Sequence, residues 1–266
     1  MRLAVCLAFL AAAGCASTAE ERFRRGADLT RASEDRYEAI NRRVHAFNNE
    51  VDRLIVRPPA VAYRAVVPQP MRRAVNNFYR NLGEPLNGLN AAAQGKPKSA
   101  FRALDRFLIN IVLGGAGFAD EASRLGLDEQ PHDIGQTLAV WGVRSGPFVM
   151  LPVFGPSTLR DGIALMVEFA IDPVGLGSGI LLNRTQSTIQ ILTRVVDQRA
   201  ELIERGEQIR RGSADDYATI RSAWLQLRLA ELWDGNPPLI EEEWDDEPDA
   251  TAPAPEAESK PPEEPE

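Results

Sequence analysis

Cysteine and histidine are scarce in this 266-residue sequence, which contains two of each. Cys6 lies in an N-terminal segment that we expect to be cleaved, so the mature chain would keep only Cys15 and could form no internal disulfide. A metal site built around His132 from the neighbouring acidic residues would lack a second histidine, and a solvated loop is the better interpretation. We therefore predict no metal site.

Motifs of enzymes and of nucleotide-binding proteins are missing as well. The GLGSG stretch around Ser178 does not have the G-x-S-x-G spacing of a lipase, and no predicted strand precedes it. The GGAGFA stretch, Gly114 to Ala119, lacks the lysine of a phosphate-binding loop. We predict that the protein is not an enzyme and uses no cofactor.

No hydrophobic run is long enough to cross a bilayer. The most apolar predicted helix, Pro97 to Leu113, would be about 25 Å long, whereas the hydrocarbon core is about 30 Å thick. The stretch 162–182 is longer, but Glu168, Asp172, Pro173 and several glycines interrupt it. Two interpretations stay open: these pieces form the core of a soluble helical bundle, or they lie in one leaflet around a protein-lined cavity. Composition alone favours the soluble core.

Basic residues are outnumbered by acidic ones, and the net charge is −8. Residues 241–266 hold 12 acids and 1 lysine, which leaves 26 of the 38 acids and 29 of the 30 basic residues in the rest of the chain. Because this acidic, proline-rich end has little apolar surface to bury, we predict a disordered tail over 236–266. The weakly basic remainder has no aromatic and basic platform, which argues against nucleic-acid binding.

The N-terminus has the pattern of a bacterial lipoprotein. Arg2 precedes an apolar run from Leu3 to Ala13, and small residues lead directly to Cys15. We predict a signal peptide over 1–14, lipidation of Cys15, and a tether over 15–32, because this segment is small, polar and charged. No aspartate follows the cysteine, which favours the outer membrane. The alternative is that Cys15 belongs to a signal cleaved elsewhere.

From Ser33 onward, apolar residues recur with the spacing of amphipathic helices. Prolines, glycines and capping residues set the bounds of these helices. The predicted helices are Ser33 to Pro58, Met71 to Leu82, Pro85 to Gln94, Pro97 to Leu113, Ser157 to about Pro173, Ile189 to Gly206 and Tyr217 to Trp233. Strand patterns are nearly absent, so the fold class is all-α, in one domain over 33–235.

Four stretches follow one another along this domain. They are DRYEAINRRVHAFN (Asp35 to Asn48), VRPPAVAYRAVVPQPMRRAVNNFYRNLGEPLNGLN (Val56 to Asn90), QGKPKSAFRALDRFLINIVLGGAGFADEASRLGL (Gln94 to Leu127) and DIGQTLAVWGVRSGPFVMLPVFGPSTLRD (Asp133 to Asp161). In this order they resemble the MlaA family, also called VacJ, over about Asp35 to Trp233. The resemblance implies a ring of amphipathic and interfacial helices, embedded in one leaflet around a central channel.

The resemblance also implies a function. Family members are outer-membrane lipoproteins that remove mislocalised phospholipids from the outer leaflet and pass them through an amphipathic channel to a soluble periplasmic carrier (MlaC-like), often beside a trimeric porin. We expect the same of this protein, which would face the periplasm and maintain outer-membrane lipid asymmetry. The alternative is a non-transporting periplasmic scaffold lipoprotein.

Particular residues take their expected roles from the same resemblance. Phe47 and Asn48 would keep the ring closed to inner-leaflet lipid, although a core phenylalanine and a solvated amide are an equal alternative. Gly114, Gly115 and Gly117 would form a flexible corner near the channel, but a helix C-cap followed by a loop explains them equally well. Other positions that match the family, as support or channel lining, are Asn41, Arg42, Asn110, Gln136 and Trp141.

Overall fold

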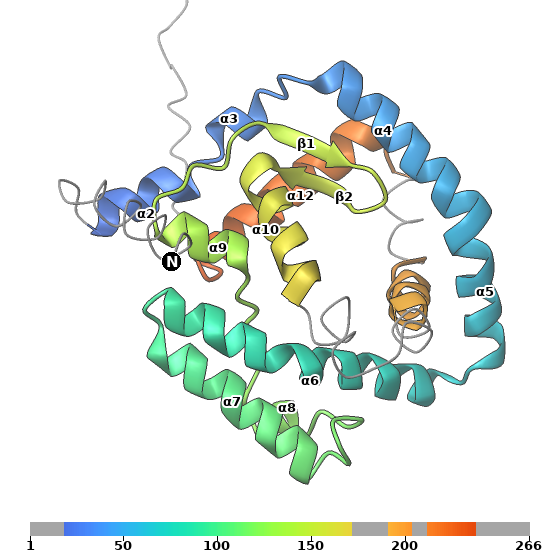
Figure 1. Ribbon diagram of the computed structural model, residues 1–266. Helices are drawn as coiled ribbons and strands as arrows, with labels where there is room; N and C mark the ends of the chain where they lie inside the picture. Colours follow the sequence, from blue (N-terminus) through green and yellow to red (C-terminus); the bar gives the residue numbers. More distant parts are fainter. Residues whose placement is uncertain (1–18, 172–190, 204–211, 238–266) are drawn as a thin grey trace, which may run out of the picture.

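The computed structural model describes residues 19–171, 191–203 and 212–237. The predicted signal peptide, Cys15, the GLGSG stretch and the acidic tail beyond Pro237 lie outside the described residues. Helices dominate the described part, and they follow an arc that curves around a two-stranded hairpin (Figure 1). No helix of this part is both long and apolar enough to span a membrane.

One side of the arc is a long curved rod made of α4 (Glu38–Val51), the π-helical turn η1 (Asp52–Val56) and α5 (Arg57–Val66). The prediction that this helix begins at Ser33 is wrong, because Asp35 has a φ of 44° and separates α4 from the short α3 (Thr30–Ser33). The predicted stop at Pro58 is also wrong. Pro58 and Pro59 occupy the first turn of α5, where their missing N–H groups and fixed φ are tolerated.

The bottom of the arc in Figure 1 is α6 (Gln69–Ala93), which packs along α7 (Pro97–Val112). The sequence predicted two helices here with a break at Gly83, yet α6 continues through Gly83 and Pro85. A proline inside a helix costs about 3 kcal/mol and a glycine about 1 kcal/mol. Packing against α7 offsets these costs: a Cβ on Gly88 would lie 3.3 Å from the carbonyl oxygen of Ala100, so the two helices approach closely.

After α8 (Glu121–Arg124) and α9 (Ile134–Val140), the chain forms a β-hairpin that the all-α prediction missed. Strand β1 (Phe148–Leu151) pairs antiparallel with β2 (Gly155–Thr158), so that Met150 lies opposite Pro156. Prolines at 152 and 156 hide the strand pattern in the sequence, since proline is confined to strand ends and edges. Phe148 and Met150 point into a small core with Ala32 and Tyr217.

Three further helices lie inside or behind the arc in Figure 1. They are α10 (Leu159–Ile171), the helix over 191–203, and α12 (Asp216–Leu232). The predicted positions of all three are confirmed where the structure describes them. The predicted cap of α10 is not: Ser157 lies in β2, and the hydroxyl of Thr158 accepts the hydrogen bond from the Asp161 N–H at 3.2 Å.

The segment predicted as a tether is folded where the structure describes it. Residues Ala19–Ala27 form α2, which packs on α9. A Cβ on Gly26 would lie 1.9 Å from the carbonyl oxygen of Ala139, so only glycine allows this backbone contact. Ala27 and Leu29 are buried in a cluster with Ala139 and Leu232.

Two contacts between elements distant in sequence close the arc into a ring (Figure 1). The first places β1 on α4, and the second places α9 on α6. No covalent bond joins the elements at either place, and side-chain hydrogen bonds cross both contacts. We refer to the two contacts as the hairpin joint and the α9 joint.

Candidate site: a polar interior with an apolar exterior

Burial is inverted relative to an ordinary soluble protein. Nine of the fifteen buried apolar residues in the described part are alanines, while nineteen polar or charged residues are buried. Many large apolar side chains are exposed instead. Those of α4, η1, α5 and α7 form what we call the apolar surface: Ile40, Phe47, Leu54, Ile55, Val61, Val66, Phe101, Leu104, Leu108, Ile111 and Val112. An exposed apolar area of this extent indicates contact with a membrane or with another protein.

Helix α10, which lies within the ring in Figure 1, has an exposed apolar face of its own. It consists of Ile163, Met166, Val167 and Ile171. The buried side of the same helix carries Arg160, Asp161, Gly162 and Ala164. The helix therefore presents apolar side chains to the space around it and fixes its position through charged ones.

Two asparagines of α4 hold the hairpin joint. The Asn48 amide donates to the carbonyl of Leu151 at 2.9 Å, and its oxygen accepts from the Val153 N–H at 2.7 Å. The buried Asn41 oxygen likewise accepts from the Met150 N–H at 2.9 Å, and its amide donates to the carbonyl of Phe148 at 3.2 Å. Asn48 is therefore neither a solvated amide nor a channel-lining group: it attaches the hairpin to the arc.

The neighbouring predicted residues have different surroundings. Phe47 is 53% exposed and so is not a core phenylalanine. Arg42 donates to both oxygens of Asp215 at 3.1 and 2.7 Å and lies over the ring of Tyr217, 4.6 Å from its centroid. These hydrogen bonds lower the pKa of Asp215 to about 2. Arg42 thus connects α4 to the start of α12.

The glycine corner after α7 is a hydrogen-bonded turn. The N–H of Gly117 donates to the carbonyl of Asn110 at 2.8 Å, and that of Ala119 donates to Gly114 at 2.8 Å. A Cβ on Gly114 would lie 2.2 Å from the carbonyl of Ala119, whereas one on Gly115 would meet open space. Gly115 and Gly117 have φ values of 61° and 93°. The corner therefore has the geometry of a turn after a helix C-terminus: Gly115, Ala116 and Gly117 all have positive φ, and Gly114 leaves no room for a side chain.

Asn110 belongs to a buried network beneath this corner that the sequence analysis did not find. Its amide donates to Asp120 at 3.3 Å and its oxygen accepts from the Ala122 N–H at 2.9 Å. Arg106, which is 2% exposed, donates to Glu84 at 2.6 Å and pairs with Asp120 at 3.3 Å. The network joins α6, α7 and α8. The sequence gives no clear signal for it, because Arg106 is one of four charged residues on α7, and only the structure shows that it is the buried one.

The α9 joint is formed by another set of amides. Thr137 donates to the oxygen of Asn90 at 3.2 Å, and Gln94 donates to Thr137 at 3.1 Å. Gln136 is buried beside the His132 ring, with its oxygen 3.2 Å from Nδ1, and the Trp141 indole donates to the carbonyl of Ala93 at 3.1 Å. Gln136 and Trp141 therefore lie in or beside this joint.

A cavity of about 210 Å³ lies between α9, β2, α10 and α12. Its lining includes Asp133, Asp161, Glu168, Trp224, Arg228 and Glu231. Arg228 donates to Asp133 at 2.6 Å, to Asp161 at 2.9 Å and to Glu231 at 2.9 Å. Burial lowers the pKa of Arg228, but the paired carboxylates raise it more, so the guanidinium stays charged. The sequence analysis did not single out any of these residues as functional.

Two carboxyl groups of this cavity have opposite pKa shifts. Burial raises the pKa of Asp161, but Arg228 and Arg160 together lower it by more than burial raises it, so the net shift is downward. Glu168 forms no such ion pair with any described residue: burial raises its pKa, and the hydrogen bond from the Ile134 N–H only partly offsets the increase. No cluster of potential metal ligands occurs among the described residues.

The residues predicted from family positions thus lie at three separate places instead of around one pocket. Asn41, Arg42 and Asn48 lie at the hairpin joint, with the exposed Phe47 beside them. Asn110 and the glycines form the corner after α7, and Gln136 and Trp141 lie at the α9 joint. None of them lines the cavity around Arg228.

Comparison with known sequences identifies the family. Residues 33–231 match the family described as MlaA lipoprotein. This chain belongs to the MlaA lipoprotein family. It is 35% identical over 224 residues to the intermembrane phospholipid transport system lipoprotein MlaA of Escherichia coli strain K12, an alignment that covers 80% of this chain and 81% of that protein. The MlaA of Shigella flexneri is 37% identical over 217 residues, again with 80% and 81% coverage.

A solved structure from this family supports the same conclusion. It comes from work on the structural basis for maintenance of bacterial outer membrane lipid asymmetry, and it matches this chain with a TM-score of 0.62 and 34% identity. The match covers 74% of this chain and 98% of the solved one. The MlaA family region, 33–231, spans both ring joints and the glycine corner, while α2 precedes it.

Proposed function

We propose that this protein is an outer-membrane lipoprotein that removes mislocalised phospholipids from the outer leaflet and passes them to a periplasmic carrier, which maintains lipid asymmetry. The observation that supports this most strongly is the inverted burial: large apolar side chains outside and paired charges inside. This is how a protein should be built if its exterior contacts acyl chains and its interior accepts a polar headgroup. No bond is made or broken in this function.

The thickness of a leaflet agrees with this proposal. A helix with its side chains is about 10–12 Å in diameter, and one leaflet contributes about 15 Å of hydrocarbon. A ring of helices lying flat therefore fits within one leaflet without any spanning segment. In such an arrangement the apolar surface, including the exposed Phe47, contacts lipid tails.

A phospholipid in transit has two opposite requirements. Transferring acyl chains into water costs about 0.8 kcal/mol per methylene, so two bare chains would cost tens of kcal/mol. The headgroup, by contrast, needs a polar route. The apolar face of α10 inside the ring would accompany the tails, and the buried polar groups nearby would accompany the headgroup. The carrier and a trimeric porin are the partners we expect on the two sides of this route.

The predicted residues then act mainly on the ring itself. Asn41 and Asn48 keep the hairpin attached to α4, and a detached hairpin would admit lipid sideways from the inner leaflet. The glycine corner after α7 forms the turn next to the Arg106 network. Acylation of Cys15 would hold the ring at the periplasmic surface of the outer membrane. Gln136 and Trp141 would keep the α9 joint closed.

Deletion of the gene in its native organism tests this proposal. We expect the outer-leaflet phospholipid content, measured by enzymatic labelling of intact cells, to rise and to return to normal on complementation. Unchanged leaflet composition would instead favour the non-transporting scaffold. A second measurement separates anchoring from embedding: with Cys15→Ala, an embedded ring still partitions into detergent, whereas a tethered soluble bundle washes off.

A further inference from the structure

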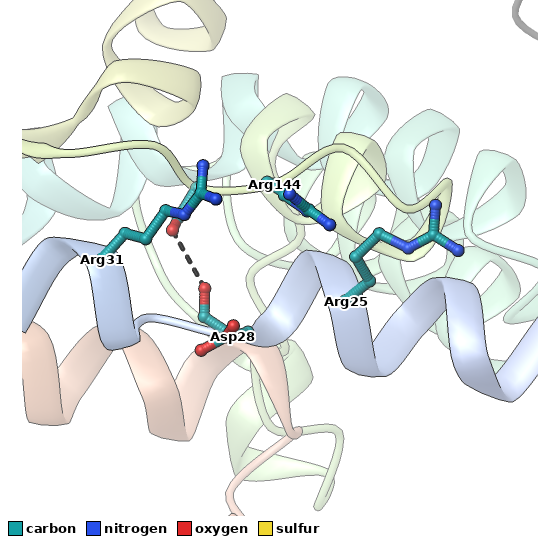
Figure 2. A pocket seen from close by; sticks show the side chains of 5 residues that line it. Arg25, Asp28, Arg31 and Arg144 are labelled. Atoms are coloured by element: carbon teal, nitrogen blue, oxygen red, sulfur yellow. Dashed lines mark hydrogen bonds between the residues drawn. The ribbon is translucent and has the colours of Figure 1, made fainter.

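Three arginines line one cavity at the N-terminal end of the fold. Arg25 comes from α2, Arg31 from α3, and Arg144 from the loop after α9; with Asp28 and Ser145 they line a space of about 210 Å³. Figure 2 shows the Arg144 side chain between those of Arg25 and Arg31. This volume is below the roughly 300–1,000 Å³ of pockets for drug-sized ligands, so it suits a small polar group.

The cavity has an excess of positive charge that the described part of the protein does not neutralise. Within the described residues, none of the three guanidinium groups forms a hydrogen bond or a close salt bridge. Hydrogen bonds from Thr30 lower the pKa of Asp28, and the charges of Arg144 and Arg31 lower it further from a longer distance. Asp28 is the only acid in the lining. One oxygen of its carboxylate accepts from the N–H and the hydroxyl of Thr30, at 2.9 and 2.6 Å. Three arginines that share a single carboxylate around one cavity leave an excess of positive charge, which suits an anionic ligand.

The backbone that carries these arginines is rigidly fixed. The buried Arg160 donates to the carbonyl of Gly26 at 2.5 Å and to that of Val143 at 3.2 Å, so it joins the α2 segment to the loop. Ser145 donates to the carbonyl of Asp28 at 2.9 Å. The backbone positions of the arginines therefore keep their spacing without a ligand, so binding has to order only their exposed side chains.

The position of the cavity in the chain places it at the membrane. Three residues lie between Cys15 and Ala19, the first residue of α2, and these four steps along the chain span at most about 14 Å when extended. Arg25 lies six residues further along the helix, about 9 Å at 1.5 Å per residue. If Cys15 carries the acyl anchor, Arg25 lies within roughly 23 Å of it. Trp141, 48% exposed, precedes Arg144 by three residues, and tryptophan is enriched at membrane interfaces.

We infer that Arg25, Arg31 and Arg144 bind the headgroup phosphate of a phospholipid in the leaflet that holds the ring. This inference rests on the proposed function, because it requires the ring to lie in a membrane. The bound headgroup would set the depth and the tilt of the ring. The arginine-lined cavity lies partly outside the family region, because Arg25 and Arg31 precede residue 33.

The acidic tail is the rival occupant. Trp233, close to the end of the described chain, contacts Phe23 of α2 edge to face, with ring centroids 4.8 Å apart. The 12 acids of the tail over 241–266 are complementary in charge. Phospholipid is favoured because the lipid anchor and the exposed Trp141 both bring this face to the headgroups, and the experiment separates the two occupants.

The test uses the mature full-length chain with Cys15→Ala, exported from an ordinary secretory signal so that no acyl group anchors it. Flotation measures its partition onto phosphatidylcholine vesicles with or without phosphatidylglycerol. We expect Arg25→Gln, Arg31→Gln and Arg144→Gln each to lower partition onto the phosphatidylglycerol vesicles about fivefold, and the triple variant on the order of a hundredfold. The loss should shrink at high salt.

Arg24→Gln is the matched control. Arg24 neighbours Arg25 on α2 and loses the same charge, but it pairs with Glu20 at 2.9 Å and lies outside the cavity. We expect it to change partition less than twofold. If Arg24→Gln costs as much as Arg25→Gln, the attraction is diffuse and the site does not exist; the same holds if the triple variant binds like the parent.

Truncation after Pro237 distinguishes the occupants. If phospholipid occupies the cavity, removing the tail raises partition by the same factor in the parent and in the triple variant. A rise confined to the parent would show that the tail fills the cavity, and would overturn the inference. Partition onto pure phosphatidylcholine at high salt reports the apolar surface alone. If it persists while the arginine variants have no effect, the inference fails and the proposed function stands.

Discussion

The contributions of Asn41 and Asn48 to the hairpin joint can be measured separately, because each accepts a hydrogen bond from a different backbone N–H of the hairpin. Asn48→Ala removes two hydrogen bonds to the hairpin, one to the Leu151 carbonyl and one from the Val153 N–H. A neutral hydrogen bond contributes about 1 kcal/mol net, so the pair contributes about 2 kcal/mol. Since 1.4 kcal/mol is a factor of ten, the population with a detached hairpin tip should rise about thirtyfold.

Hydrogen exchange of individual amides measures this directly, by NMR on the protein in detergent. In Asn48→Ala the Val153 amide should exchange about thirtyfold faster, because the Asn48 oxygen is its acceptor. The Met150 amide should be unaffected, because it donates to Asn41. Asn41→Ala should give the opposite pattern. Equal exchange of the Val153 amide in the parent and in Asn48→Ala would refute the role of this residue in closing the ring.

Three other substitutions give independent checks. Arg106→Gln should lower the free energy of unfolding by about 3–5 kcal/mol in chemical denaturation, because it leaves buried carboxylates unpaired, whereas the exposed Arg124→Gln should change it by less than about 0.5 kcal/mol. Gly117→Ala should lower the melting temperature more than Gly115→Ala, since both have positive φ but only the Gly117 Cβ would lie 2.8 Å from the Asn81 amide nitrogen. Glu168→Gln should stabilise the protein at neutral pH. Because the pKa of Glu168 is raised, the folded state binds the carboxyl proton more tightly than the unfolded state does. The stabilisation from this proton is complete at low pH and is lost as the pH rises through the folded pKa, whereas glutamine stays neutral at every pH. The gain should therefore disappear in unfolding curves recorded below the unfolded carboxyl pKa of about 4.3.

Helix periodicity predicted those parts of the fold that depend on local sequence. The bounds of α7 and α12 agree with the prediction to within a residue, because their capping residues and prolines coincide with the ends of the apolar pattern. The break predicted at Gly83 did not occur, because packing of α6 along α7 outweighs local propensity. The hairpin was missed because Pro152 and Pro156 interrupt its strand pattern.

The site was harder to predict than the fold, for a physical reason. Periodicity shows that a helix has an apolar face, but it does not show whether that face meets protein or lipid. In α7 the apolar residues Phe101, Leu104 and Leu108 are exposed, while Arg106 is buried. An interpretation of α7 as part of a soluble core would place these apolar side chains inside the protein and Arg106 on its surface. Family resemblance drew attention to Asn41 and Asn48, but their partners on the hairpin became visible only in three dimensions.

The inverted arrangement also explains why so many buried residues are alanine or glycine. Large apolar side chains that face outward cannot fill the space between helices, so helices must approach through small residues, as α2 approaches α9 at Gly26 and α6 approaches α7 at Gly88. Such contacts give close packing but little hydrophobic stabilisation. Specific orientation must then come from directional bonds, which the networks of Arg106 and Arg228 provide. A ring held together in this way can keep a polar interior next to lipid, and it depends on every charge in that interior having a partner.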